Sequence, residues 1–354
     1  MTDDQAGSAF RFNGSWREFA PIAFTNLLLT IVTLGIYRFW ATTRERRYLW
    51  SRTDFIDDPL EWTGTGLELF IGFMMVVALL FVPLLVIQFL VQALAMRGEF
   101  GLAALATILA YAALLYLYGL ARYRALRYRL SRTFWRGIRG GSDDGGWGYA
   151  LTALWKMAVG AFVFGFFIPW SMTSLWNDRW GRLSFGNQDF AATAGWRPII
   201  GRFLLFYLLP IAGCVGGLVL FADSVRGTDV PPSPATFAAA MMGAVTVYFL
   251  LGIVAIVYYA AFLREAIGAL TLNRLRFAFT ARTMDWIWLI LGHIGLVVVT
   301  LGIGLIFIGY RNWSFFIRHM DASGEIDLAG LAQSTTRAPG QGEGLLDAFD
   351  VGAL

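Results

Sequence analysis

Seven long apolar segments are the feature that most limits what this chain can fold into. A helix of about 20 apolar residues crosses the hydrocarbon core of a bilayer, which is roughly 30 Å thick. Of the 354 residues, 57% are hydrophobic and only 15% are charged, a composition unlike that of a soluble domain. The sequence therefore predicts a mainly α, polytopic helical membrane protein. Its apolar segments are 20–41, 67–96, 100–120, 150–176, 198–222, 236–263 and 286–310.

Three of these segments are interrupted by residues that break helices. The block Thr33-Leu34-Gly35-Ile36 interrupts the first segment, and the same four residue types recur as Thr300-Leu301-Gly302-Ile303 in the last. The segment 150–176 contains Gly165 and Pro169. Glycine adopts backbone geometry that other residues resist, and proline cannot continue a helix. We therefore predict helix breaks at Gly35, Gly165, Pro169 and Gly302.

An internal repeat is indicated by the recurrence of this block. Residues 10–54 align without a gap on 277–321, and a fainter middle copy appears when Gly35 is set on Gly165. Alternating runs at 10–14, 60–66, 182–186 and 274–280 read as short strands, and a lone strand has no partner for its backbone groups. We expect these strands to meet in a small sheet on the cytoplasmic face. The predicted organisation is a disordered N-terminus (1–9), repeat unit 1 (10–125), repeat unit 2 (126–270), a partial repeat unit 3 (271–328) and a disordered tail (329–354).

The arginines favour one membrane topology over another. If all seven segments cross the membrane, the loop arginines divide 15 to 10 between its two sides. If the three broken segments enter and return on one face, and only the other four cross as two hairpins, the division is 23 to 2, with Arg97 and Arg226 outside. Cytoplasmic loops carry an excess of Lys and Arg. The count therefore favours two transmembrane hairpins plus three re-entrant segments, with seven plain crossings as the alternative.

A polar residue lies nine positions before the break glycine in each copy: Asn26, Lys156 and His293. Ionisable groups inside a membrane are costly and usually face a cavity or a partner, so one hypothesis is a polar centre at which the three side chains meet. The alternative is that Asn26 bridges helices, Lys156 extends to the interface and His293 is a satisfied core residue.

Arginines at the ends of the apolar segments are candidates for contact with anionic phospholipid headgroups, because guanidinium groups bind phosphate in a bidentate manner. Ordinary topogenic charge is the alternative, and the position of these arginines beside apolar segments argues against nucleic acid as a partner. The candidates are Arg44, Arg46, Arg47, Arg124, Arg127, Arg129 and Arg311.

Motifs of catalysis and metal binding are missing from the sequence. It has no His-Glu-x-x-His, no phosphate-binding loop and no Gly-x-Ser-x-Gly elbow. Cys214 is the single cysteine, and His293 and His319 are 26 residues apart, which is not the spacing of a metal site. We therefore expect no enzymatic activity, no catalytic residue, no metal and no cofactor.

With these motifs in hand, the chain resembles the YjgN-like family of bacterial inner-membrane proteins, a domain of unknown function. The resemblance rests on Phe10-x-Phe-x-Gly14, Asn26-Leu-Leu-Leu, Thr33-Leu-Gly-Ile-Tyr37-x₂-Trp40 and Arg46-Arg-Tyr48. The chain departs from the family pattern at Phe39, where proline usually precedes the tryptophan. The resemblance implies a multi-pass protein of the bacterial inner membrane. It also implies a membrane protein partner, because such genes often neighbour a membrane-associated zinc metallopeptidase.

Two functions are compatible with these features. One is transport or channel-like passage of a solute or lipid through the centre of the repeats, with Asn26, Lys156 and His293 lining the route. The other is a non-enzymatic accessory or scaffold role for a membrane partner such as that metallopeptidase. The oligomeric state is left open by the sequence.

Overall fold

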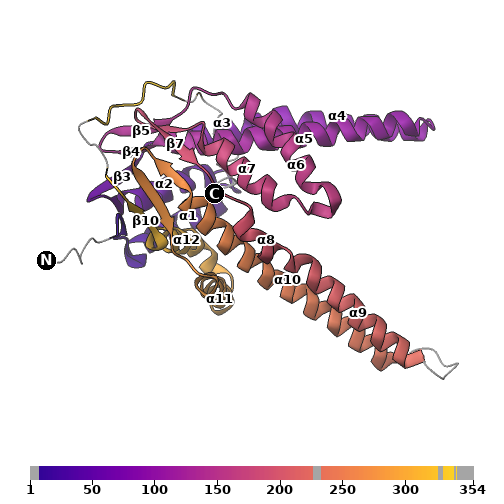
Figure 1. Cartoon of the computed structure of the whole chain (residues 1–354). Helices are drawn as coiled ribbons and strands as arrows, with labels where there is room; N and C mark the ends of the chain where they lie inside the picture. The colour runs from indigo at the N-terminus through magenta and orange to yellow at the C-terminus, as the bar shows by residue number, and fades with distance from the viewer. Residues whose placement is uncertain (1–7, 226–232, 326–329, 339, 341–354) are drawn as a thin grey trace.

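Ten short strands form one antiparallel sheet in chain order, from which the helices extend (Figure 1). The computed structural model describes residues 8–225, 233–325, 330–338 and 340. The two ends of the sheet approach each other, since Ala9 N donates to Asp321 Oδ1 at 3.1 Å and Ser8 Oγ donates to Met320 O at 3.2 Å. The sheet is therefore nearly closed. Its strands are β1 (Phe10–Phe12), β2 (Thr53–Phe55), β3 (Asp58–Trp62), β4 (Thr133–Trp135), β5 (Ile138–Gly141), β6 (Ser184–Phe185), β7 (Gln188–Ala192), β8 (Leu270–Leu272), β9 (Leu275–Phe279) and β10 (Met320–Ser323).

Tight turns and helical connections alternate along the sheet. Turns of two residues join β2 to β3, β4 to β5, β6 to β7 and β8 to β9, and each contains a residue with positive φ, such as Asp57 (65°) or Gly137 (73°), as hairpin turns require. Neighbouring strands are antiparallel, so these turns all lie at the same end of the strands, which we call the turn edge of the sheet. The helical connections all leave from, and return to, the opposite edge, which we call the helical edge.

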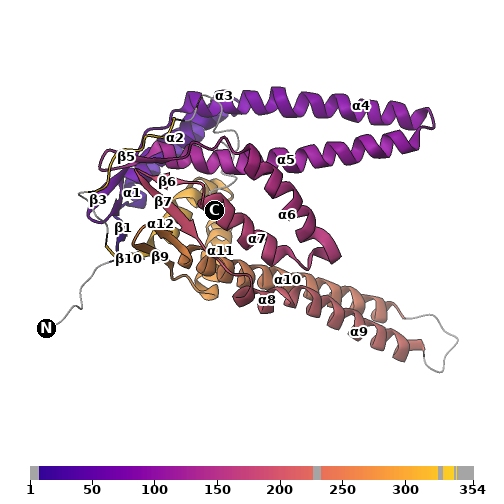
Figure 2. The same ribbon diagram turned by 45° about the horizontal axis from the view of Figure 1, so that its top comes forward.

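Two of the helical connections are long hairpins that project from the sheet on the same side in both views (Figures 1 and 2). The first contains α3 (Gly66–Val76), η1 (Val77–Phe81), α4 (Val82–Met96) and α5 (Phe100–Arg132). The π-helical turn η1 directly precedes Pro83, whose missing N–H and bulk an uninterrupted α-helix would not accommodate. The second contains α8 (Arg197–Phe203), α9 (Leu205–Val225) and α10 (Pro234–Gly268).

The other three connections are shorter, broken hairpins. They are α1 (Trp16–Val32) with α2 (Arg38–Ser51), α6 (Trp147–Gly165) with α7 (Ile168–Trp180), and α11 (Thr283–Val299) with η2 (Ile303–Phe307) and α12 (Ile308–His319). The first and last of them touch, because the Phe19 ring lies 6.1 Å from that of Phe307 and 5.2 Å from that of Tyr310. The layer of helices thus closes on itself as the sheet does.

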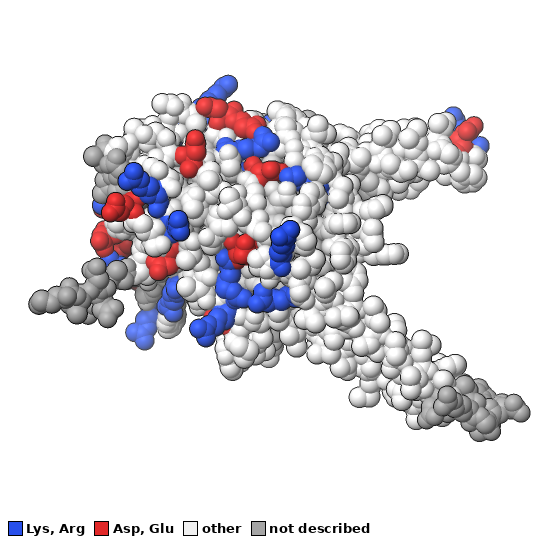
Figure 3. Space-filling model, viewed as in Figure 1, with Lys and Arg blue, Asp and Glu red and all other residues white. Residues whose placement is uncertain are grey.

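Four helices in the described chain are long and apolar enough to cross a membrane: 100–132, 147–165, 197–222 and 234–268. The end of α6 is irregular, since Phe162, Val163 and Phe164 have non-helical backbone angles. Charged residues gather around the sheet, and the projecting parts of the long hairpins are uncharged on the visible face except near the tip formed by α4 and α5 (Figure 3). This distribution is that of a polytopic helical membrane protein with a polar sheet at one end.

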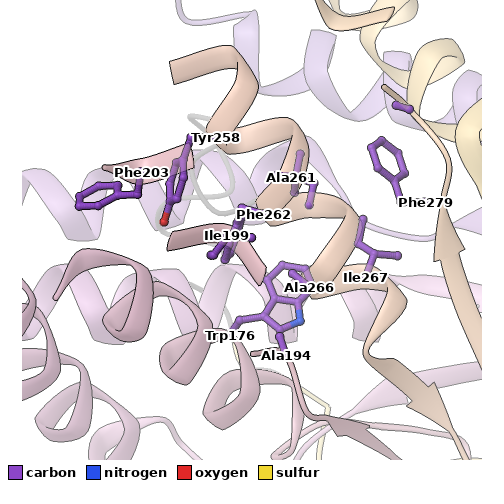
Figure 4. Packing of buried hydrophobic residues seen from close by; sticks show 12 residues of the cluster. Trp176, Ala194, Ile199, Phe203, Tyr258, Ala261, Phe262, Ala266, Ile267 and Phe279 are labelled. Atoms are coloured by element: carbon purple, nitrogen blue, oxygen red, sulfur yellow. The ribbon is translucent and has the colours of Figure 1, made fainter. Parts of the chain in front are cut away.

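The core lies where the sheet meets the helices. Its largest cluster joins Trp176 of α7, Phe203 of α8, Phe262 of α10 and Phe279 of β9 (Figure 4). Ala266 is fully buried in this cluster, and its small side chain lets α10 approach its neighbours closely. Burial of apolar area at about 25 cal/mol per Å² makes such contacts the main force that holds the helices on the sheet.

Parts of the strand prediction correspond to observed elements, because β1, β3, β6 and β9 lie in or across the predicted runs. The other six strands were not anticipated. The predicted disordered N-terminus falls on residues 1–7, outside the described residues, and on residues 8 and 9, which contact β10.

The predicted disordered tail, 329–354, is described at residues 330–338 and at residue 340; its other residues lie outside the described part. Residues 330–338 pack along β5 and the β6–β7 turn. Gln333 Nε2 donates to Gly137 O at 2.7 Å, Arg139 N donates to Gln333 Oε1 at 3.1 Å, and Asn187 Nδ2 donates to Gly330 O at 3.0 Å. These residues therefore belong to the folded structure.

Candidate functional site

The tips of the broken hairpins have a shared backbone geometry. At the first tip, Leu34 and Gly35 both have positive φ (51° and 92°), and at the last tip Leu301 and Gly302 have 50° and 93°. Gly35 N donates to Thr30 O at 2.7 Å, the bond that closes a helix in a Schellman motif, and Gly302 N donates to Val297 O at 2.8 Å. A left-handed leucine is strained by roughly 1 to 2 kcal/mol, so both tips hold the same uncommon conformation.

Each tip presents an apolar side chain that is left almost fully exposed by the described part of the chain. Leu34 and Leu301 are each 93% exposed, and Phe164 at the middle tip is 97% exposed. The middle tip is reached through Val163 and Phe164, which have positive φ like Gly165, and Tyr207 Oη of α9 donates to Phe164 O at 3.0 Å. Pro169 lies in the first turn of α7, after the break.

The residues of the predicted polar centre each face the returning helix of their own hairpin. Asn26 Nδ2 donates to Ala41 O of α2 at 3.3 Å, and Asn26 is 7% exposed. Lys156, also 7% exposed, donates to Ser174 Oγ and forms an ion pair with Asp178, both on α7. His293 lies beside Arg311 of α12, whose positive charge acts on it. No hydrogen bond or ion pair between described residues joins any two of the three.

The seven arginines predicted to contact headgroups fall into different environments. Arg44 and Arg47 are exposed on α2. Arg46 and Arg127 are 4% and 5% exposed and face the protein interior, where Arg46 stacks 5.0 Å from the Trp62 ring. Arg124 Nε donates to Gly145 O at 3.1 Å. The remaining two, Arg129 and Arg311, are half-buried. Headgroup contact stays a prediction, and Arg44 and Arg47 are the residues placed to make it.

A cavity of about 550 Å³ lies between the two long hairpins and the middle broken hairpin. Helices α5, α6, α7 and α10 form its walls. Its lining is largely apolar, and polar groups enter it from α5, α6 and α7. The apolar and aromatic lining includes Met157, Ile168, Met172, Leu175, Trp176, Tyr259, Phe262 and Leu263, and the polar lining includes Tyr118, Arg122, Tyr149, Ser171 and Arg179.

Arg179 is the most unusual polar group of this cavity. It is 3% exposed, and its Nε and Nη1 atoms have no hydrogen-bond partner. Its guanidinium lies 5.4 Å from the Trp176 ring. Arg179 lies three residues beyond the apolar segment 150–176. Burial lowers its pKa to about 10, and the positive charges of Arg122 and Arg129 also lower it. Arg179 is thus a buried cation at neutral pH that meets an aromatic face and other cations.

A second cavity, of about 220 Å³, lies next to the first on the side of the sheet. Trp176 and Arg179 line both cavities. The second cavity is otherwise bounded by apolar groups from β7, β8, β9 and β10 and from their neighbouring helices, among them Phe190, Leu270 and Phe277. Arg179 therefore lies at the junction between the helical layer and the inside of the sheet.

Sequence reasoning missed Arg179, although one signal could have found it. In the repeat alignment that sets Gly35 on Gly165 and on Gly302, Arg179 corresponds to Leu49 and Phe316. Leu49 is 4% exposed in a hydrophobic cluster, and Phe316 packs against another. An arginine at a position that is apolar in the other two copies marks a core site with a different task. In the described residues, no group of three or more His, Cys, Asp or Glu is arranged to hold a metal ion.

The comparisons with known proteins agree with this architecture. A family described as bacterial protein of unknown function (DUF898) matches residues 7–348. The chain is 35% identical over 77 residues to "Inner membrane protein YjgN" of Salmonella typhimurium, which is 22% of this chain and 20% of that protein. It is 31% identical over 85 residues to "Inner membrane protein YjgN" of Escherichia coli K12, which is 24% of this chain and 21% of that protein.

The chain thus covers about a fifth of the length of these curated relatives. No solved structure matches it. The family match extends over nearly the whole chain, and the relatives' names and the long apolar helices agree on the location. The chain belongs to the DUF898 family of bacterial proteins of unknown function and is a multi-pass protein of the bacterial inner membrane.

Proposed function

We propose that this protein moves an amphiphile, such as a membrane lipid, through the cavity between its two long hairpins. The observation that carries the proposal is that the two cavities lie next to each other and share Trp176 and Arg179 as lining residues. A ligand pocket of several hundred Å³ with an apolar lining and a few polar groups has the size and chemistry of a site for a small amphiphile. The apolar walls suit an acyl chain, and the polar end suits a headgroup.

The proposal includes a membrane arrangement. The long hairpins cross the bilayer, and the three broken hairpins enter it and return, so that the whole sheet stays on the cytoplasmic side. Support comes from the sheet: every helical connection leaves from and returns to the same helical edge. Support also comes from the tips, because Leu34, Phe164 and Leu301 are almost fully exposed and would be covered by hydrocarbon.

This arrangement gives an amphiphile a way to the cavity. Non-helical backbone is tolerated at membrane depth where protein or water covers it, and Tyr207 of the long hairpin covers Phe164 O. The middle broken hairpin lies between the two long hairpins (Figure 2). It forms one wall of the cavity through Met157, Ala161 and Ile168. A lipid that enters beside it would meet Arg179 and Tyr149 at the inner end.

Reconstitution tests this function. The full chain is placed in vesicles of phosphatidylethanolamine and phosphatidylglycerol with a trace of fluorescent phosphatidylglycerol, and dithionite reports how fast the label changes leaflet. We expect faster exchange than in protein-free vesicles. Ala161→Trp should abolish the gain, because Ala161 is exposed at the cavity wall. The matched control is Ala158→Trp on the same helix, since Ala158 is exposed but does not line this cavity. No gain over protein-free vesicles, or equal rates for the two variants, would refute the proposal.

A further inference from the structure

The strongest unexplained feature of the molecule is the buried charge of Arg179. A guanidinium that is 3% exposed and finds no acceptor for Nε and Nη1 among the described residues has lost its hydration without gaining a counter-ion from them. Buried charges in proteins are ordinarily paired, because an isolated one is costly. The carboxylate next in the chain does not pair with it, since Asp178 forms an ion pair with Lys156.

Other buried arginines of the described chain differ from Arg179 in this respect. Arg127 has a hydrogen-bond acceptor, because its Nη2 donates to Arg337 O at 3.5 Å. Arg179 has the Trp176 ring, at 5.4 Å, and its side chain is one of the two that line both cavities. The positive charges of Arg122 and Arg129 also act on this position, so an anion placed there would be attracted by several cations.

We propose that Arg179 binds the anionic head of an amphiphile, a phosphate or carboxylate group, whose apolar chain lies along the wall of the 550 Å³ cavity. This rests on the proposed function and names its substrate class. The anion would accept hydrogen bonds from Nε and Nη1, the charge-assisted type that is stronger than a neutral pair. The apolar lining from Met172, Phe262 and Leu263 would cover the chain.

The predicted repeat supports a ligand-binding task in place of a structural one. The equivalent positions in the other two copies hold Leu49 and Phe316, so the returning helix can be packed there without a cation. An arginine that only maintained the fold would need partners inside the protein. Replacing Arg179 by the residue of the first copy, Arg179→Leu, is therefore a test that separates the two roles.

The experiment measures binding and stability of the full chain in detergent. The soluble probes are dihexanoyl-phosphatidylglycerol, its zwitterionic phosphatidylcholine counterpart and inorganic phosphate. For the wild type we expect binding of the phosphatidylglycerol probe by titration calorimetry, and weaker binding of the other two by about tenfold or more. Arg179→Leu should lose at least about tenfold in affinity for that probe and should have a higher Tm than the wild type without ligand, because the uncompensated charge is gone. Arg179→Lys keeps the charge and should retain part of the affinity.

Arg318→Gln is the matched control, because Arg318 lies on the returning helix α12 and is exposed. It should bind as the wild type does. The assignment would be overturned if Arg179→Leu bound the phosphatidylglycerol probe as tightly as the wild type. It would also be overturned if Arg179→Leu had a lower Tm than the wild type without ligand while both Arg179→Leu and Arg179→Lys kept the wild-type affinity. Inorganic phosphate that binds as tightly as the amphiphile would overturn the choice of an amphiphile. Binding without leaflet exchange would leave this site standing and refute transport alone.

Discussion

The ion pair between Lys156 and Asp178 allows a decisive test of what the predicted polar centre does. Lys156→Met removes the ammonium and keeps a chain of similar length, so Asp178 loses its cation. Breaking a fully buried pair costs about 3 to 5 kcal/mol. The side chain of Asp178 is 31% exposed and that of Lys156 is 9% exposed, so we expect a smaller loss, of about 2 kcal/mol. The double variant Lys156→Met/Asp178→Leu leaves no charge at this position and should recover most of the lost unfolding free energy.

Equilibrium unfolding in mixed micelles with increasing dodecyl sulfate measures these differences for the wild type, the two single variants and the double variant. The coupling energy of the cycle should be about 2 kcal/mol in favour of the native pair. The rates of leaflet exchange should follow the stabilities of the variants, and the double variant should remain active. The reasoning is refuted if Lys156→Met unfolds like the wild type but loses exchange. Lys156 would then line the route, as the polar-centre hypothesis from the sequence holds.

Three further predictions concern the helix tips, the start of the first long hairpin and the tail. Gly35→Ala should cost about 1 kcal/mol of unfolding free energy, because Gly35 has a φ of 92°. Gly101 lies in helix α5 and also has space for a Cβ atom, so Gly101→Ala should raise the unfolding free energy by up to about 1 kcal/mol. Equal effects of the two substitutions would contradict the assigned tip conformation. Glu68→Gln should cost about 1 to 2 kcal/mol, because Glu68 caps α3 and pairs with Arg132 at 2.5 Å, and the exposed Glu61→Gln should stay within about 0.5 kcal/mol. Deleting residues 330–354 should speed hydrogen exchange of the Arg139 amide, which donates to Gln333, but not that of Phe190, which donates to Leu183; unchanged exchange at both would mean that the segment does not cover β5.

The positions at which the helices break could be read from the sequence, and the strands mostly could not. Glycine in the repeated block marks where the chain leaves the helix, and Gly35 and Gly302 have nearly the same φ. The preceding leucines also adopt positive φ, which no propensity would suggest for a branched apolar residue. Strand β4 is three residues long and directly follows α5, so it has no alternation to detect. It forms because β3 and β5 offer it partners on both sides.

The candidate site was harder to predict, because the role of each polar side chain depends on whether it is buried in the folded structure. Lys156 was singled out by its place in an apolar segment, and its partners, Ser174 and Asp178, follow from the return of the chain in α7. Arg179 looked like one more arginine at a segment end. Its identity as a buried, unpaired cation depends on which way α7 faces, and that is set by packing against α6, β7 and α10. A single sequence does not contain this orientation.

The order of strands in the sheet has a consequence for how the chain is made. Each strand pairs with its immediate predecessor, so a chain that leaves the ribosome can add strands one after another. The two sheet ends are different, because Ser8 and Ala9 bond to residues 312 or 313 positions later. The outer edge of β1 therefore stays unpaired until β10 is synthesised. The two ends of the sheet come together only after all the strands between them have been made.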